Sequence, residues 1–358
     1  MKKFGKILLS VLLVLVLVVG GYAGYVFLDY DRLEDNLELT VEESQTALTE
    51  KLPVGEEHRI LSYNVGFGAY SDDYSFFMDG GKESRARSEE AVYENIGGAM
   101  EEIRKTDPDL ALIQEVDTDG TRSHHIDQSA LIREAMEGYN SVFAQNYDSP
   151  YLFWPLLEPH GANKAGQMTL SRWDVTSAVR RSLPIEEGVM KLVDLDRCYS
   201  VSRIPTDNGR ELVLYCLHLS AYTSDGVIAE EQVEMLCKDM LAELEKGNYT
   251  IAGGDFNKDL LGNSGEIFGV SGEEYTWAQP IPAELIPDRL TIVAPFDREN
   301  PVASCRNADR PYGPDDFRVT VDGFIVSDNV KVVENAVVDA GYRWSDHNPV
   351  WMDFLLIP

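Results

Sequence analysis

The stretch YTIAGGDFN, residues 249–257, joins an apolar run to a polar end. Its apolar part predicts a buried strand that opens into Asp255 and Asn257. A single carboxylate at a strand end is most often a turn or cap residue, and Asp255-Phe256-Asn257 can form an Asx-turn. The stretch alone therefore does not distinguish a turn from a functional site, and the rest of the sequence has to decide.

Other apolar stretches end in similar polar groups. HRILSYNV (58–65), DLALIQEV (109–116), RELVLYCLHL (210–219), FRVTVDGFIVS (317–327) and PVWMDFLL (349–356) all read as strands. The polar residues that interrupt, close or precede them are Asn64, Glu115, His218, Asp322, Asp346 and His347. Because these groups recur at strand ends with specific neighbours, a shared site is favoured over a set of unrelated turns.

The chemistry of this set suits phosphate esters. A phosphodiester is anionic and repels hydroxide, so a site that hydrolyses it must neutralise charge, align a water and support the departing alkoxide. One divalent ion, two imidazoles and a carboxylate supply these functions. Hard carboxylate and amide oxygens are the ligands that Mg²⁺ or Mn²⁺ prefers.

The remaining pattern predicts an α/β architecture. Helices are expected at 88–106, with Ser88 as N-cap, at 127–137 and at 226–246. Further strands are expected around 140–146, 167–172, 174–182 and 330–339, and residues 262–300 read as an irregular insertion. Strand-rich patterning without regular βαβ repeats favours two mixed β-sheets face to face with helices outside, a four-layer α/β sandwich.

The N-terminus predicts a membrane segment. Residues 7–28 are uncharged and overwhelmingly apolar, follow Lys2, Lys3 and Lys6, and are long enough to span a bilayer. We expect a cytoplasmic tip (1–6), a transmembrane signal anchor (7–28), an acidic stalk without strands (29–57) and an extracytoplasmic domain (58–358). A cleaved signal peptide is the alternative, and either reading exports the body.

The charge of the chain limits its partners. There are 61 acidic and 31 basic residues, which give a formal net charge of −30. Broad nucleic-acid-binding faces need surplus Lys and Arg, so this balance argues against such a role unless a metal ion supplies the positive charge. Four scattered cysteines form no disulfide framework, although a single bridge is chemically allowed in an exported body.

The order of these motifs resembles the endonuclease/exonuclease/phosphatase superfamily, with its deoxyribonuclease I-like fold. The resemblance covers about residues 58–357 and is strongest in GGDFN (253–257) and SDHNPV (345–350). The weaker motifs are LSYNV (61–65), IQEV (113–116), GQMTLSR (166–172), LHLSAY (217–222) and VDGFIVSD (321–328).

The resemblance implies a metal site built on Glu115. It makes Glu115 the principal ligand of Mg²⁺ or Mn²⁺, with Asn64 and Asp346 beside it directly or through water. These three residues come from stretches far apart in the sequence, so the site would exist only in the folded chain.

The resemblance also implies catalytic roles. Asp255 would orient or deprotonate the attacking water, and Asn257 would hold a phosphate oxygen. His347, oriented by Asp322, would stabilise the phosphoryl oxygens or take part in proton transfer. His218 would contact phosphate and help to protonate the leaving oxygen.

One departure from the superfamily pattern concerns His218. Deoxyribonuclease-like members carry a carboxylate that supports this histidine, whereas here Ala165 stands near that position. The sequence therefore predicts that His218 lacks its partner.

These observations predict an exported, membrane-tethered, Mg²⁺-dependent phosphoric-ester hydrolase. The alternatives are an endonuclease of the same superfamily and a non-catalytic surface binding protein. A lipid headgroup or a small phosphate ester fits the acidity better than nucleic acid does. The aromatic loop 66–88 follows Asn64 directly and is the leading candidate for substrate selection, although its aromatics could equally pack the loop down. The sequence indicates no protein partner.

Overall fold

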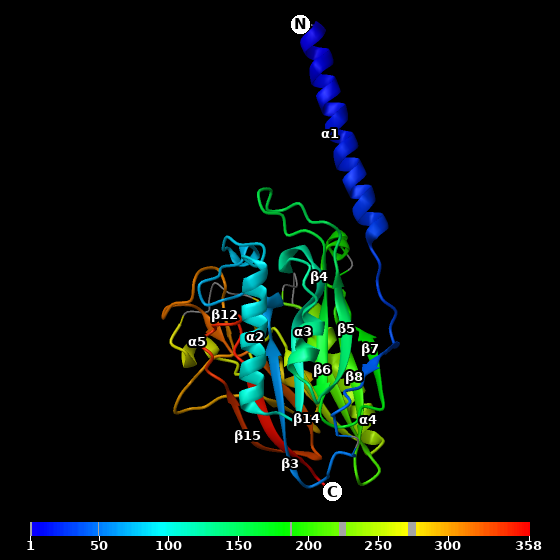
Figure 1. The fold of residues 1–358 in the computed structure, drawn as a ribbon, viewed down its shortest axis with the longest axis vertical. Coiled ribbons are helices and arrows are strands. Elements are labelled where there is room, and N and C mark those ends of the chain that lie inside the picture. The colour runs from blue at the N-terminus through cyan, green and yellow to red at the C-terminus, as the bar shows by residue number, and fades with distance from the viewer. Residues whose placement is uncertain (1, 49, 187, 222–226, 271–276) are drawn as a thin grey trace.

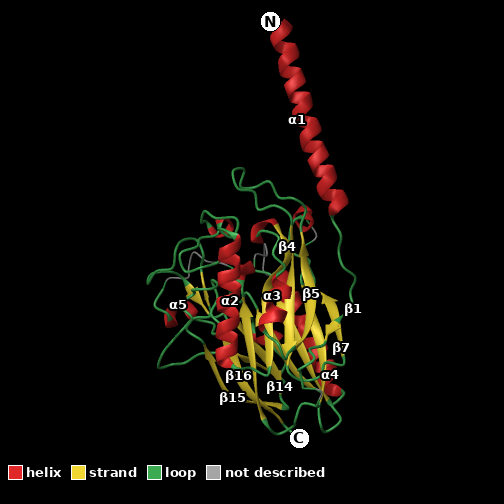
Figure 2. Cartoon of the chain, viewed as in Figure 1, coloured by secondary structure: helices red, strands yellow, loops and turns green. Residues whose placement is uncertain are grey.

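Two seven-stranded mixed β-sheets lie face to face in the computed structural model, with helices on their outer faces (Figures 1 and 2). The structure describes the whole chain except residues 1, 49, 187, 222–226 and 271–276. The four-layer α/β sandwich expected from the sequence is confirmed.

The first sheet has the order β1-β7-β8-β9-β10-β14-β11. Only β9 and β10 run parallel, and this pairing brings their carboxyl ends to the same edge. The strands are β1 (Leu37–Leu39), β7 (Ser177–Ser182), β8 (Cys198–Pro205), β9 (Glu211–His218), β10 (Tyr249–Asp255), β14 (Asp322–Ser327) and β11 (Leu290–Val293).

The second sheet has the order β15-β16-β3-β4-β6-β5-β2, with β3 and β4 parallel. Its strands are β15 (Val330–Val337), β16 (Val350–Leu356), β3 (Glu57–Asn64), β4 (Leu110–Gly120), β6 (Asn163–Ser171), β5 (Asn140–Asp148) and β2 (Val41–Glu42). A separate two-stranded ribbon joins β12 (Cys305–Arg306) to β13 (Arg318–Val319).

Four helices lie where the sequence predicted them, and the short α5 lies in the segment 262–300 that was expected to be irregular. They are α1 (Lys2–Asp29), α2 (Glu89–Thr106), α3 (Gln128–Ala135), α4 (Val227–Glu245) and the short α5 (Ser264–Ile267). Ser88 caps α2 by accepting a hydrogen bond from the Ala91 amide, as predicted. Single 3₁₀ turns occur at Gly66–Gly68, Phe77–Asp79, Thr121–Ser123, Val189–Leu192 and Ala283–Leu285.

Side chains that point alternately to the two faces of each sheet contribute to three apolar cores. Ile60 on β3 faces the core between the two sheets, whereas its neighbour Leu61 faces the core under α2 and α3. A third core joins the first sheet to α4, with Val213 and Leu236 among its members. The central strands are therefore buried on both faces, which explains their continuous apolar runs.

Several expectations were wrong at the margins of the sheets. The segment 30–57 was expected to contain no strand, yet β1 pairs with β7, β2 pairs with β5, and Leu52 is fully buried between the sheets. The insertion 262–300 contains β11, which pairs with β14. The strand β8 was missed, and the run 317–327 divides into β13 and β14. All four cysteines lie in the described part of the chain, and all are free, buried thiols.

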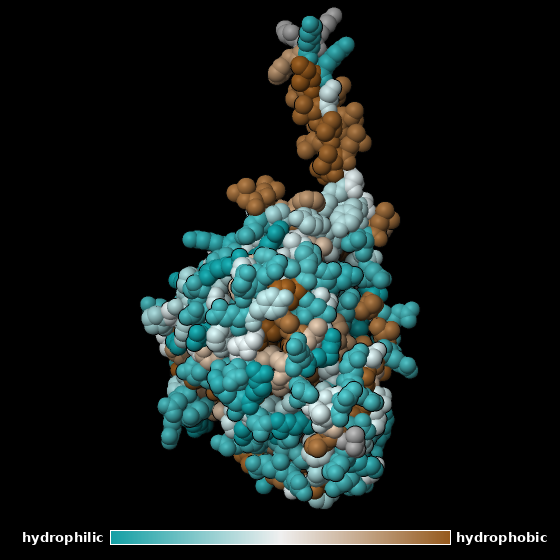
Figure 3. Space-filling model, in the orientation of Figure 1, coloured by the Kyte–Doolittle hydropathy of each residue, from teal (hydrophilic) through white to brown (hydrophobic). Residues whose placement is uncertain are grey.

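Helix α1 projects from the body (Figure 1). Residues Lys3–Asp29 are long and apolar enough to cross a membrane, a test that a signal sequence also passes, and nearly all are exposed. Figure 3 shows this helix as an apolar rod above a mostly polar body.

Candidate active site

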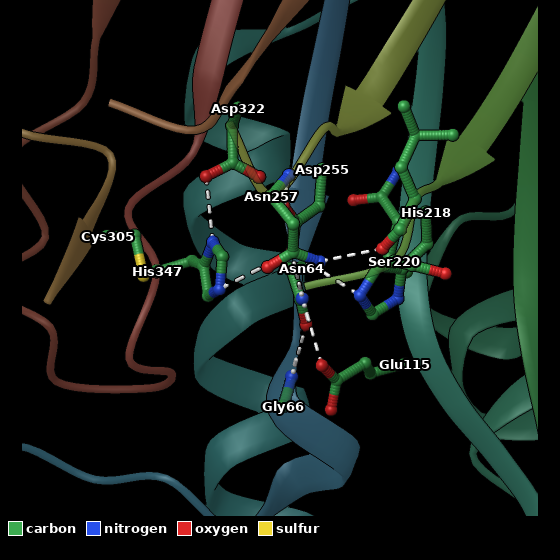
Figure 4. Close-up of polar contacts among 12 residues, drawn as sticks. Asn64, Gly66, Glu115, His218, Ser220, Asp255, Asn257, Cys305, Asp322 and His347 are labelled. Carbon is green, nitrogen blue, oxygen red and sulfur yellow. Dashed lines mark hydrogen bonds and ion pairs between the residues drawn. The ribbon is translucent and has the colours of Figure 1, made fainter. Parts of the chain in front are cut away.

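Asp255, at the end of β10, is the point on which the predicted site residues converge (Figure 4). Its Oδ2 atom lies 3.1 Å from Nδ2 of Asn64, 3.5 Å from Nε2 of His218 and 3.7 Å from Nε2 of His347. Its Oδ1 atom accepts a hydrogen bond from the Asn257 amide at 2.8 Å. The carboxylate is thus held at both oxygens.

Strand register explains this convergence. Asp255 lies opposite His218 across the parallel β9–β10 pair and opposite Asp322 across the antiparallel β10–β14 pair. Gly254 makes the close strand pairing possible, because its φ is +148° and a Cβ there would lie 2.0 Å from the Leu217 carbonyl oxygen. The glycines of GGDFN therefore serve packing, and its Asp and Asn face the site.

His347 is held by Asp322 through a hydrogen bond of 2.7 Å from Nδ1 to Oδ2. Burial disfavours the imidazolium, but the charge and hydrogen bond of Asp322, together with the contribution of Cys305, outweigh it and raise the pKa of His347 well above its usual value. The hydrogen bond directs Nε2 toward Asp255. The pair can stabilise negative charge or move a proton at Nε2.

His218 has the opposite environment. Its Nδ1 atom is buried and has no hydrogen-bond partner among the described residues, as the sequence departure at Ala165 predicted. Burial, together with the nearby cation of Arg197, lowers the pKa of His218 well below its usual value. The two imidazoles that flank Asp255 are therefore not equivalent.

Burial also acts on Asp255 itself. Only 1% of the residue is exposed, and desolvation raises the pKa of its carboxyl group, with the charge of Asp322 adding to the effect. The nearby imidazolium of His347 opposes this shift. A carboxylate with a raised pKa is a stronger base than an ordinary aspartate.

Glu115 and Asp346 form the acidic side of the site. Oε1 of Glu115 accepts a hydrogen bond of 3.1 Å from Nδ2 of Asn64, and Glu115 has a φ of +57°. Burial and the charge of Glu115 both raise the pKa of Asp346. Two carboxylates that repel each other beside a cavity are a donor set that suits a divalent cation, so the residues present fit Mg²⁺ or Mn²⁺.

Asn64 connects the two halves of the site. Its amide oxygen accepts a hydrogen bond of 3.0 Å from the Gly66 amide, so its amide nitrogen faces Glu115 and Asp255. In this arrangement Asn64 orients both carboxylates. Its oxygen is already engaged within the chain.

A second acidic grouping has metal-binding spacing. Ligand atoms of Asp255, Asp322 and His347 all lie within 4.8 Å of one another. Two of its members, Asp322 and His347, are already hydrogen-bonded to each other through Oδ2 and Nδ1. We therefore favour Glu115 and Asp346 as the metal ligands, with the Asp255–His347–Asp322 group as a proton-handling unit.

A cavity of about 570 Å³ opens over these residues. It is lined by Glu115, His218, Asp255, Asn257, Asp346 and His347, so it contains most of the predicted set. Aromatic side chains form much of the remaining wall, namely Phe67, Tyr70, Phe76, Phe77, Trp154 and Trp277. Loop 66–88 both packs down and lines the cavity, because Phe67 and Tyr70 are buried whereas Met78 is 62% exposed.

Arg197 also lines the candidate site, although the sequence did not predict it. It lines the cavity, is 8% exposed and donates to the His218 carbonyl at 3.3 Å. No ion pair of Arg197 with a carboxylate occurs in the described part of the chain, and its charge interacts only at longer range with Asp194, Asp255 and Glu115, so it remains available to an anion. It stands directly before β8, the strand that was not predicted, so nothing in the sequence marked it.

Residues 61–347 match the Endonuclease/Exonuclease/phosphatase family. The chain belongs to this family. Members of the family hydrolyse phosphoric esters. No curated protein matches the sequence.

Solved structures share the fold at low identity. An endonuclease/exonuclease/phosphatase from Beutenbergia cavernae has a TM-score of 0.59 and 19% identity, over 84% of this chain and 72% of that one. ANGEL2, a 2′,3′-cyclic phosphatase, has a TM-score of 0.55 and 16% identity, over 89% and 99%. TDP2 of D. rerio, complexed with a single-strand DNA product, has a TM-score of 0.53 and 13% identity, over 84% and 99%.

Proposed function

We propose that this protein is a membrane-tethered, Mg²⁺- or Mn²⁺-dependent hydrolase of phosphoric esters, with its site outside the cytoplasm. The observation that carries the proposal is the convergence of Asn64, His218 and His347 on one buried carboxylate, Asp255, beside the Glu115–Asp346 pair. A non-catalytic binding protein would have no need of this arrangement. The buried charged groups of this site lower the stability of the fold, and a catalytic role explains why they are there.

The roles of the residues follow from their contacts. Asp255 accepts a proton from the attacking water at Oδ2, the oxygen that faces both imidazoles. His347, held by Asp322, stabilises the phosphoryl oxygens through Nε2–H. His218, Asn257 and Arg197 contact the phosphate from the cavity wall. Each role places a donor or acceptor where charge develops during hydrolysis.

Glu115 and Asp346 would hold the divalent cation, with Asn64 orienting Glu115. When bound, Mg²⁺ or Mn²⁺ neutralises phosphate charge and lowers the pKa of water. The net charge of −30 counts against polyanionic substrates. We therefore propose lipid headgroups and small phosphate esters as substrates in preference to nucleic acid.

The test is metal-dependent hydrolysis of bis-p-nitrophenyl phosphate by the purified full chain. We expect turnover with Mg²⁺ or Mn²⁺, loss of turnover with a chelator, and loss in Asp255→Ala and His347→Ala. Asp297→Asn, at an exposed aspartate outside the cavity, is the matched control. Turnover that is absent with both metals, or unchanged in the two site variants, contradicts the proposal.

Topology has a separate test. Helix α1 and its flanking lysines support an N-terminus inside and a body outside the cell. Protease added to intact cells should then digest the body. A protected body would contradict export without bearing on catalysis.

A further inference from the structure

Residues 151–160 form a hairpin that projects from the body, and we name it the apolar finger. Two backbone hydrogen bonds of 3.0 Å between Leu152 and Gly161 close its base, and the His160 amide donates to the Trp154 carbonyl at 3.0 Å. The His160 ring is hydrogen-bonded to the Ser84 carbonyl at 2.8 Å, which ties the finger to loop 66–88. The finger is therefore built into the fold at its base.

The tip of the finger exposes large apolar side chains. Phe153 is 54% exposed, Trp154 65%, Leu156 74% and Leu157 fully exposed. Figure 3 shows an apolar projection on the body, at the end from which α1 leaves. Four neighbouring large apolar residues in water are unfavourable, and such patches mark contact with an apolar partner.

The finger also contacts the candidate membrane helix. The Tyr22 hydroxyl donates to the Tyr151 carbonyl at 3.0 Å, and the Tyr151 amide donates to the Tyr25 hydroxyl at 3.0 Å. The rings of Tyr22 and Phe153 lie 5.3 Å apart in an edge-to-face arrangement. Tyr22 stands seven residues before Asp29, the end of α1, so the contact lies about 10 Å back along the helix. A bilayer that holds α1 would meet the finger at this level, where tyrosines commonly mark the interface.

The finger lies at the mouth of the catalytic cavity. Leu152 and Trp154 line the cavity, while Leu156 and Leu157 at the tip do not. On loop 66–88, Phe77 and the 62% exposed Met78 supply further apolar lining. In Figure 1 the finger, in green, and this loop, in light blue, lie at the end of the body nearest α1. The cavity therefore opens toward the side on which the membrane would lie.

We propose that the apolar finger inserts into the lipid bilayer and holds the cavity mouth at the level of the headgroups, so that the substrates are phosphate esters carried by membrane lipids. The substrate part rests on the function proposed above, whereas the insertion does not. Insertion is driven by the apolar tip, since residues 151–157 carry no charge and the chain as a whole is strongly acidic. It therefore needs no anionic lipid.

Insertion is tested by the depth of a spin label. The four native cysteines are buried, so Leu157→Cys in the full chain can be labelled selectively. The matched control is Val333→Cys on β15, a 45% exposed apolar site away from the cavity. In phosphatidylcholine proteoliposomes the label at 157 should be accessible to oxygen and shielded from a water-soluble nickel chelate, whereas the label at 333 should be readily accessible to the nickel chelate.

Two outcomes would overturn insertion. Either the label at 157 is as accessible to the nickel chelate as the label at 333, which places the tip in water, or it is shielded from both reagents, which indicates a protein contact in place of lipid. Neither readout depends on catalysis.

The substrate class is tested with the double variant Leu156→Ser/Leu157→Ser. Reconstituted in vesicles of phosphatidylcholine, sphingomyelin and phosphatidic acid, it should release phosphate or headgroup about tenfold more slowly than the unchanged chain. Hydrolysis of soluble bis-p-nitrophenyl phosphate should not change, because neither residue lines the cavity. Val333→Ser is the control. If the double variant is slowed equally on both substrates, or is not slowed on vesicles, the proposal is overturned. If the unchanged chain hydrolyses neither substrate, the proposed function fails, and the depth measurement still decides insertion.

Discussion

The Nδ1 atom of His347 lies 2.7 Å from Oδ2 of Asp322, at the residue where β14 begins. This contact fixes which ring nitrogen of His347 faces Asp255. Asp322→Asn would keep the shape but remove the charge that favours the imidazolium, so we expect kcat to fall by about 10²–10⁴-fold. Steady-state kinetics on bis-p-nitrophenyl phosphate measure this. A change of less than fivefold, in a variant with an unchanged melting temperature, would contradict the assigned role.

Asp255 should control the pH dependence of the reaction. Catalysis requires its ionised form, and burial raises the pKa of the carboxyl group. The acid limb of kcat/KM is therefore expected at a higher pH than an ordinary aspartate would give, with activity lost as the pH falls through that limb. A profile that stays flat down to pH 4 would argue that another group is the base.

The raised pKa of the Asp255 carboxyl group also affects the stability of the fold. A carboxyl whose pKa is raised by folding stabilises the fold when protonated, and this stabilisation is lost as the pH rises through the folded-state pKa. In metal-free protein at pH 8, Asp255→Asn should therefore raise the free energy of unfolding by about 1 kcal/mol while abolishing activity. Thermal unfolding with the chelated protein tests this, and a clearly lower melting temperature than that of the unchanged chain would refute it.

Glu115 should link metal binding to both activity and stability. Mn²⁺ bound to the folded chain alone should raise the melting temperature, since a ligand at 100 times its Kd adds about 2.7 kcal/mol. Glu115→Gln should lose most of this increase and reduce turnover by at least about 100-fold. Calorimetric titration with Mn²⁺ gives the affinity directly. If Glu115→Gln binds Mn²⁺ with an unchanged Kd, the metal site must lie elsewhere, and the Asp255–Asp322–His347 group is the next candidate.

Arg197 and Arg180 offer a comparison between two buried guanidinium groups. Arg180 is fully buried and pairs with Asp196 at 2.8 Å, whereas Arg197 makes no such pair in the described structure. Arg180→Met should therefore destabilise the fold by about 1–3 kcal/mol, because the carbonyl oxygens of Gln145 and Asp196 lose their donor and only Arg32 still pairs with the Asp196 carboxylate. Arg197→Met should leave stability nearly unchanged but raise KM or lower kcat by about tenfold or more. Denaturant unfolding and kinetics on both variants separate the two roles.

Leu52 tests whether the acidic segment belongs to the folded body. Its side chain is fully buried between the sheets, so Leu52→Ala should cost about 2–5 kcal/mol of unfolding free energy. Leu48→Ala, at a 43% exposed position in the same segment, should cost less than about 1 kcal/mol. Equal effects of the two substitutions would contradict the packing of this segment.

The sequence by itself determined the central architecture and most members of the candidate site. Strands β3, β4, β9 and β10 and helices α2 and α4 are long enough for their apolar periodicity to be read locally. Polar residues at strand ends stand out against such runs, so Asp255 and its neighbours could be named in advance. The unpartnered His218 was also predicted from Ala165, because the missing carboxylate is visible as a residue type.

Only the tertiary structure decided the edges and the environment of the site. β1 and β2 have three and two residues, too few for a period, and they exist because β7 and β5 offer unpaired edges. Arg197 has no carboxylate within ion-pair distance in the described part of the chain, and the finger contacts α1 through Tyr151 while Leu152 and Trp154 line the cavity. Sequence patterns report what each segment does alone, whereas these properties depend on which distant groups are, or are not, within reach.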